Sequence, residues 1–281
     1  MIRITSVSNP HVTQIRDLHT TRGRKKNGLL LMEGPHLYTA LFAANFLPRE
    51  IYFSPELLQR TPEGRDLLAS LLHPAPGLAK IPAIEVSERV AAALSDAQTS
   101  QGVVCVVSTE LFQAERLQAR RTTAPRPALL ILDDLADPGN MGTILRTALA
   151  ADVEEVLLTP HCVDCFSPKV MRAAAGAHVA LPIWTDMEWS AIEERTIRHC
   201  GSESQRIFST EASSSIPYYA EDLRNPFALI IGNEAHGLSR QARMLASRAI
   251  GIPLANAVES LNAAMAAGII LFEAVRQLHH G

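Results

Sequence analysis

The second half of the sequence is built from short apolar runs separated by amphipathic stretches. The runs read ALLILDDL, EVLLT, VALPIW, RIFST, FALIIGNE and AIGIP. Most of them lack the alternating polar residues of a half-exposed strand, so they favour a parallel sheet covered by helices on both faces. We therefore predict an α/β domain over residues 128–281, with helices near 141–151, 168–177 and 186–199 and a long closing helix near 259–279.

A smaller unit with the same alternation comes first. Four apolar runs, GLLLMEG, EIYFS, IPAIEVS and QGVVCVV, are separated by helical stretches at the spacing of βαβ units. Asn9 and Pro10 mark the start of an earlier helix, since Asn is a preferred cap and Pro fits the first helical position. We predict an α/β domain over residues 1–107, followed by a polar linker, 108–127, that ends with two prolines.

The charge of the chain is uneven. Its formal net charge is −3, which excludes a general affinity for nucleic acid. Residues 1–28, however, carry six basic residues and one acidic residue. Such a segment is either a basic arm that binds phosphates or a solvated terminus, and both interpretations stay open here. The basic residues nearest one another are Arg22, Arg24, Lys25 and Lys26.

Several protein classes find no support in the sequence. The N-terminus lacks the apolar core of a signal peptide, and the longest apolar run, Ala263–Phe272, is too short to span a membrane. Four cysteines in 281 residues do not suggest a disulfide framework. We therefore expect a cytoplasmic protein with no membrane partner and no metal.

An unusual polar stretch, DDLADPGNMGTILRTALA, follows the first apolar run of the larger domain. Asn140 is expected to cap the helix that begins there. Gly142 and Arg146 lie one turn apart, so the arginine could lean over the glycine toward the carboxyl end of the strand and bind a phosphate or carboxylate. The alternative is a capped helix with a surface arginine.

Two further polar stretches follow later strands. In GNEAHGLS, two glycines bracket Glu234 directly after a strand; in IPLANAVESLN, Ser260 and Asn262 precede a nearly all-apolar helix. Such a helix is buried in a core or in a subunit interface. Because ligands of open α/β sheets bind beyond the carboxyl ends of the strands, the three stretches together predict one site.

These stretches resemble the three motifs of the SpoU/TrmH family of RNA ribose 2′-O-methyltransferases, in the same order. The segments SVSNPHVTQIRDL, GLLLMEGPHLYTAL and SQGVVCVV are similar to the substrate-binding domain of its two-domain members. The resemblance implies a SPOUT fold with a C-terminal trefoil knot, a homodimer, and an RNA substrate, with ribosomal RNA favoured over transfer RNA by analogy with other two-domain members.

The resemblance also implies a set of site residues. The catalytic set is Asn140, Arg146, Glu234, Ser260 and Asn262. S-adenosylmethionine (AdoMet) would bind near Gly232, Ile252, Leu254 and Leu261. Contacts with RNA would involve Arg22, Arg24, Lys25, Lys26, Glu33 and Arg172. Because arginine is effectively always protonated, we interpret Arg146 as a phosphate ligand that stabilises the developing oxyanion rather than as a base. The family often has Ser where this chain has Ala174, so an RNA-side hydroxyl is missing there.

Three rival functions remain at this point. HCVDC places Cys162 and Cys165 in a C-x-x-C pattern, which occurs in redox proteins and in half of a zinc site, although two incidental thiols also explain it. An RNA-binding protein without catalysis needs only the N-terminal domain. A dinucleotide-dependent dehydrogenase is disfavoured because there is no G-x-G-x-x-G fingerprint. His236 is interpreted as a structural loop residue.

Overall fold

The computed structural model describes residues 2–75, 78–120, 127–201, 206–256 and 258–280. By its contacts the chain divides into two compact units, residues 1–112 with 166–179, and residues 113–165 with 180–281. The predicted domain ranges differ from these units at 108–112 and at 166–179, and they remain a prediction about folding units. Part of the predicted linker, 121–126, lies outside the described residues. Within the described chain, no helix is long and apolar enough to cross a membrane.

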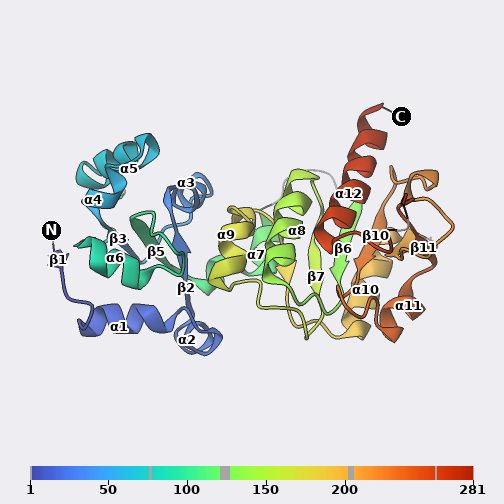
Figure 1. Ribbon diagram of the computed structural model, residues 1–281, viewed down its shortest axis with the longest axis horizontal. Coiled ribbons are helices and arrows are strands. Elements are labelled where there is room, and N and C mark those ends of the chain that lie inside the picture. Colours follow the sequence, from blue (N-terminus) through green and yellow to red (C-terminus); the bar gives the residue numbers. More distant parts are fainter. Residues whose placement is uncertain (1, 76–77, 121–126, 202–205, 257, 281) are drawn as a thin grey trace. The chain divides into compact units, whose positions relative to one another are not determined.

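The first unit is built around a five-stranded sheet in the order β1-β4-β3-β5-β2. β5 runs antiparallel to both of its neighbours, so the sheet is mixed, whereas β1, β4 and β3 are parallel. β1 and α2 lie outside the predicted elements. The elements, shown in Figure 1, are β1 (Ile2–Ile4), α1 (Pro10–Asp17), α2 (Thr21–Asn27), β2 (Leu29–Glu33), α3 (Pro35–Ala43), β3 (Glu50–Phe53), α4 (Pro55–Leu58), α5 (Pro62–Leu72), β4 (Ala83–Val86), α6 (Glu88–Leu94), β5 (Val103–Ser108) and α9 (Pro168–Ala173), with 3₁₀ turns at Thr109–Phe112 and Ala177–Val179.

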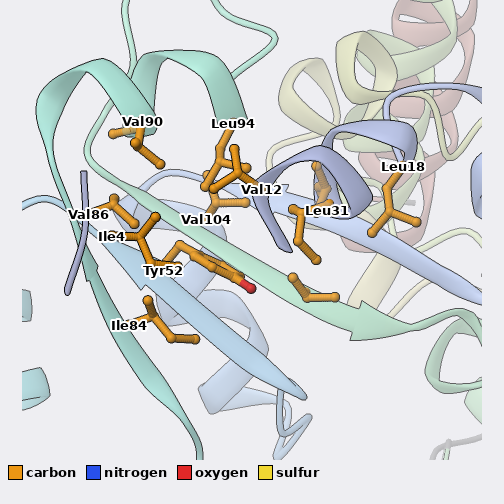
Figure 2. Packing of buried hydrophobic residues seen from close by; sticks show 13 residues of the cluster. Ile4, Val12, Leu18, Leu31, Tyr52, Ile84, Val86, Val90, Leu94 and Val104 are labelled. Atoms are coloured by element: carbon orange, nitrogen blue, oxygen red, sulfur yellow. The ribbon is translucent and has the colours of Figure 1, made fainter. Parts of the chain in front are cut away.

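Helices α1 and α6 cover one face of this sheet. Figure 2 shows Val12 of α1, Leu18 directly after α1, and Val90 and Leu94 of α6 packed over strand residues of that face. Side chains alternate along a strand, so one set of strand residues meets these helices and the other set faces away from them. α3 packs on β2 and β5 and also contacts α5. α1 begins as predicted, with the Asn9 side chain accepting the His11 amide and Pro10 in the first turn.

The second unit contains a six-stranded sheet, in the order β11-β9-β10-β6-β7-β8, in which every described pairing is parallel. The predicted parallel sheet is thus confirmed. Its elements are α7 (Ala114–Ala119), β6 (Ala128–Leu132), α8 (Pro138–Ala150), β7 (Val156–Leu158), β8 (Ile183–Trp184), α10 (Trp189–Cys200), β9 (Ile207–Thr210), β10 (Phe227–Ile231), α11 (Arg240–Leu245), β11 (Arg248–Ile250) and α12 (Ala263–His280), with a 3₁₀ turn at Tyr218–Ala220.

The helices of the second unit cover both faces of the parallel sheet. Leu129 and Ile131 of β6 share a buried cluster with Ile192 of α10 and Ala242 of α11. The intervening residues of β6 are also fully buried and point to the opposite face. α8 and α12 pack against each other, side by side in Figure 1. This double cover explains why the strands read as continuous apolar runs.

The basic N-terminal segment is folded rather than an arm, because α1 and α2 occupy most of it. Arg24 is only 4% exposed, and its guanidinium donates to the carbonyl oxygens of Leu18 and His19 at 2.9 and 2.8 Å. Arg24 as an RNA contact stays a prediction, but its burial and its hydrogen bonds to the backbone between α1 and α2 argue against it. Arg22, Lys25 and Lys26 are exposed on α2.

Replacement of Arg24 tests this structural role. We expect Arg24→Met to lower the free energy of unfolding by about 2 kcal/mol, since it leaves buried carbonyl oxygens without a donor. The measurement is the shift of the urea midpoint. Arg22→Met, two residues earlier on the same helix but exposed, serves as the matched control and should shift the midpoint little. Equal shifts in both variants would contradict the assignment.

Candidate active site at the carboxyl edge of the parallel sheet

Four loops meet where strands of the second unit end. Because β11, β9, β10 and β6 are neighbours and parallel, the loops that follow them lie at one edge of the sheet. A cavity of about 890 Å³ lies there, lined by residues of all four loops and of α8 and α12. Of the predicted site residues it is lined by Asn140, Gly232, Glu234, Ile252, Leu254, Ser260, Leu261 and Asn262.

The Glu234 carboxylate fastens the loop after β10 to the start of α8. It accepts the backbone amides of Ala136 and Asp137 at 3.2 and 3.3 Å and the side-chain amide of Asn140 at 2.8 Å. Burial by itself raises the pKa of this carboxyl, but these hydrogen bonds outweigh it and hold the pKa below its usual value. Glu234 therefore acts as an ionised acceptor that orders two loops, and its partners are amides rather than a basic side chain.

The Asn140 side chain links Glu234 to the start of α12. Its Nδ2 donates to Glu234, which leaves its Oδ1 free to accept from Asn262 Nδ2 at 2.8 Å. Asn262 Oδ1 in turn accepts the amides of Ala264 and Met265 at 2.9 and 3.2 Å, so it caps α12. One hydrogen-bond chain thus joins all three predicted polar stretches.

The cap of α8 differs from the prediction. Asp137 is the N-cap, and its Oδ1 accepts the Asn140 amide at 2.7 Å. Pro138 takes the first helical position, which suits its fixed φ, and this places Asn140 in the first turn instead of at the cap. The Asn140 side chain is therefore available for Glu234 and Asn262.

Two residues outside the predicted set hold the loop after β10 in place. Asn233 Nδ2 donates to the Asp134 carbonyl at 2.7 Å, and its Oδ1 accepts the amides of Ala235 and His236. The carboxylate of buried Asp133 accepts the Ser239 amide at 2.6 Å, and burial raises its pKa. Asn233 could have been found from the sequence, since an Asn after a strand often bonds to the backbone two residues on.

Gly232 is required by close approach. A Cβ at this position would lie 2.6 Å from the carbonyl carbon of Gly237, which no side chain tolerates. The two glycines that bracket Glu234 therefore let the loop fold back on itself at the cavity wall.

Comparison with known proteins identifies this arrangement. The sequence profile of the SpoU rRNA methylase family matches residues 127–272, and that of the MRM3-like substrate binding domain matches residues 9–105. The chain belongs to the SpoU rRNA methylase family. The resemblance noted in the sequence is thus confirmed, and so is the predicted α/β fold with a parallel-sheet domain and an N-terminal domain.

Individual members of the family match over nearly the whole chain. A tRNA/rRNA methyltransferase of Synechocystis, itself uncharacterised, is 35% identical over 98% of this chain and 93% of its own. The 23S rRNA (guanosine(2553)-2′-O)-methyltransferase of Bacillus subtilis is 29% identical over 97% and 98%. The crystal structure of an AdoMet-bound rRNA methyltransferase from Sinorhizobium meliloti superposes with a TM-score of 0.76 at 28% identity, covering 98% of each chain.

Arg146 is the member of the predicted catalytic set that does not line the cavity. It is exposed on α8 and makes no hydrogen bond or ion pair with the residues that the structure describes. Gly142 is buried one turn before it. The guanidinium of Arg146 is therefore available to a group outside this chain.

Part of the cavity wall was not predicted from the sequence. Thr210 at the end of β9 and residues 211–213 after it line the cavity, as does Arg243 of α11. The sequence offered no unusual motif after β9. Its contribution follows from the strand order, since β9 lies between β11 and β10 and its loop necessarily opens on the same space.

The RNA candidates of the first unit divide into two groups. Arg22, Lys25 and Lys26 are exposed. Arg172, in contrast, pairs with Asp96 at 3.1 Å and lies 4.0 Å from Glu33, whose side chain is largely buried and accepts the Ser95 hydroxyl. Glu33 and Arg172 thus serve an internal ion cluster, which argues against direct contact with RNA.

The cysteines of the C-x-x-C pattern do not form a reactive pair. Cys165 is buried and Cys162 is largely so, and burial raises the pKa of both thiols. Reactive cysteines need a lowered pKa, so the redox hypothesis loses its physical basis. In the described parts of the chain, no three His, Cys, Asp or Glu side chains gather as metal ligands would.

The Glu234 connection makes a pH-dependent prediction. The folded-state pKa of Glu234 lies below its unfolded value of 4.5. The carboxylate therefore stabilises the fold at pH values above 4.5, and this contribution disappears as the pH falls through the folded-state pKa. We expect Glu234→Gln to be less stable by about 1 kcal/mol at neutral pH, because Gln presents one acceptor instead of two. The difference from wild type should shrink toward pH 3.

Urea unfolding between pH 7 and pH 3 measures this difference. Glu193→Gln is the matched control, because Glu193 is exposed on α10 and makes no hydrogen bond with a described residue. A Glu234→Gln deficit that stayed constant with pH would show that the carboxylate charge does not hold the loops.

Proposed function

We propose that this protein transfers a methyl group from AdoMet to a ribose 2′-hydroxyl of ribosomal RNA. One observation carries the proposal: all three family motifs line a single cavity and are joined by the chain Glu234–Asn140–Asn262. Its similarity to a 23S rRNA 2′-O-methyltransferase from Bacillus subtilis supports the substrate class. We propose the cytoplasm as its compartment.

The cavity fits AdoMet. Its size is in the range of small-molecule sites, and its wall combines apolar side chains with loop backbone. Ile252, Leu254 and Leu261 would contact the apolar parts of the cofactor. The loop turn at Gly232 leaves room that a side chain would fill. When bound, AdoMet supplies a methyl group on a positively charged sulfur, which an oxygen nucleophile can displace.

The residues of this chain supply orientation and electrostatics rather than the reactive group. Asn140, Glu234 and Asn262 hold the loops that form the cavity, and Ser260 lies on the loop that closes it. We assign Arg146 to a phosphate of the RNA, from which its guanidinium stabilises the negative charge that develops on the ribose oxygen.

The first unit is proposed to bind RNA. It corresponds to the substrate-binding domain of the family, and α2 exposes Arg22, Lys25 and Lys26 to solvent. Cationic side chains of this kind bind the RNA backbone without reading its sequence. We also propose that the C-terminal part of the second unit forms the trefoil knot of SPOUT enzymes, in keeping with the fold of the solved relatives.

A homodimer is proposed from the surface of α12. This helix exposes Met265 and Phe272, which are 59% and 49% accessible and lie two turns apart on one side. Large exposed apolar residues on one helix side mark an interaction surface. Sedimentation analysis of the pure protein measures the oligomeric state.

The first test is cofactor binding by calorimetry. We expect wild type to bind AdoMet in the micromolar range and Leu261→Arg to lose binding, because a bulky cation would occupy the cavity of a cationic ligand. Leu278→Arg, an exposed position of α12 outside the cavity lining, is the control. If wild type bound no AdoMet, even with ribosomal RNA present, the proposed function would be wrong and RNA binding without catalysis would replace it.

Arg146 gives a second test. Because Arg146 lies outside the cavity, we expect Arg146→Lys to keep the AdoMet dissociation constant and to lower methyl transfer to ribosomal RNA about 100-fold, through loss of the bidentate fork. Radiolabelled methyl incorporation measures the rate. Full turnover in this variant would rule out bidentate gripping of a phosphate.

A further inference from the structure

The charged side chains around the cavity differ in what they already bind. Glu234 and Asp137 accept backbone amides and hold the loops together. Glu211, Glu259 and Arg243 also line the cavity, but they make no hydrogen bond or ion pair with side chains that the structure describes. The cavity therefore presents one uncommitted guanidinium and two uncommitted carboxylates.

Arg243 is placed so that its guanidinium reaches the cavity wall. It lies on α11, and its Nη2 is 3.8 Å from the point where a side chain would begin at Gly237. Gly237 has a φ of +68° and no side chain, so the loop backbone approaches the guanidinium here without an intervening Cβ. Helical side chains lean toward the N-terminus of their helix, which explains how Arg243 meets the loop that precedes α11.

The nearest buried acid does not neutralise Arg243. Asp133 is buried, and burial raises its pKa; the positive charge of Arg243 acts in the opposite direction with a smaller effect. Asp133 Oδ2 accepts from the Ser239 amide, and its buried Oδ1 has no hydrogen-bond partner among the described residues, so no ion pair joins it to Arg243 there. Arg243 is thus a cation at a cavity wall whose guanidinium donates no hydrogen bond to any residue that the structure describes.

AdoMet carries complementary charges. Its amino-acid end has one carboxylate and one ammonium group, and its sulfur is a second cation. A guanidinium is the side chain best suited to bind a carboxylate, through two parallel hydrogen bonds. We propose that Arg243 binds the carboxylate of AdoMet, with Glu211 and Glu259 as the negative side chains that favour its two cationic centres. This inference rests on the proposed function.

The test is a thermodynamic cycle between one side chain and one ligand group. Calorimetry measures the dissociation constants of AdoMet and of decarboxylated AdoMet, which lacks only the carboxylate. We expect wild type to bind AdoMet about 10-fold more tightly than the decarboxylated form. Arg243→Gln should weaken AdoMet binding by a similar factor and bind both ligands about equally.

Two further variants sharpen the result. Arg240→Gln removes a positive charge from the same short helix at an exposed position outside the cavity lining, so it should retain the wild-type preference. Arg243→Lys keeps the charge but loses the paired donors and should fall between wild type and Arg243→Gln.

The outcomes separate the inference from the proposed function. Equal AdoMet binding by Arg243→Gln and Arg240→Gln would overturn the inference and leave Arg243 as a surface arginine or an RNA ligand, with the methyltransferase assignment intact. A loss of affinity of the same size for both ligands would also overturn it, because the effect would not involve the carboxylate. Absence of AdoMet binding by wild type would overturn both.

Discussion

The site depends on one hydrogen-bond chain whose direction is fixed by chemistry. A glutamate carboxylate can only accept, so Asn140 must present its NH₂ group to Glu234 and its oxygen to Asn262. Asn262 must then donate to Asn140, which leaves its own oxygen for the first amides of α12. Three loops that follow three different strands are thereby held in one arrangement, and the ionised form of Glu234 sets the polarity of the whole chain.

Much of the fold could be predicted because apolar burial leaves a strong periodic signal. Continuous apolar runs predicted the parallel sheet, and Asn9 with Pro10 predicted the start of α1. β1 and α2 lie outside the predicted elements because a three-residue edge strand and a helix rich in Arg and Lys carry little apolar periodicity. The antiparallel direction of β5 depends on pairing between distant strands, which no local pattern records.

The candidate site could be predicted in its polar residues but not in its connections. The positions of Asn140, Glu234 and Asn262 after strands predicted that they belong to the site. The sequence did not show which of Asp137 and Asn140 caps α8, because both residue types are common caps; the cap is Asp137. The loop after β9 and Arg243 enter the site only through strand order and packing. Arg24 shows another limit of local patterns: its sequence neighbours are basic and exposed, but its own side chain is buried and bound to backbone carbonyls.

Residues 166–179 have a consequence for how such a protein can be divided. The sequence places this segment between β7 and β8, inside the range matched by the methylase profile, yet its contacts group it with the first unit. Val170, Met171, Ala174 and Ala177 are buried there. A chain that began at residue 128 would keep this segment but lose the rest of the unit with which its contacts group it. The two units are therefore not exchangeable modules, and recombination that replaced one would also have to refit a segment of the other.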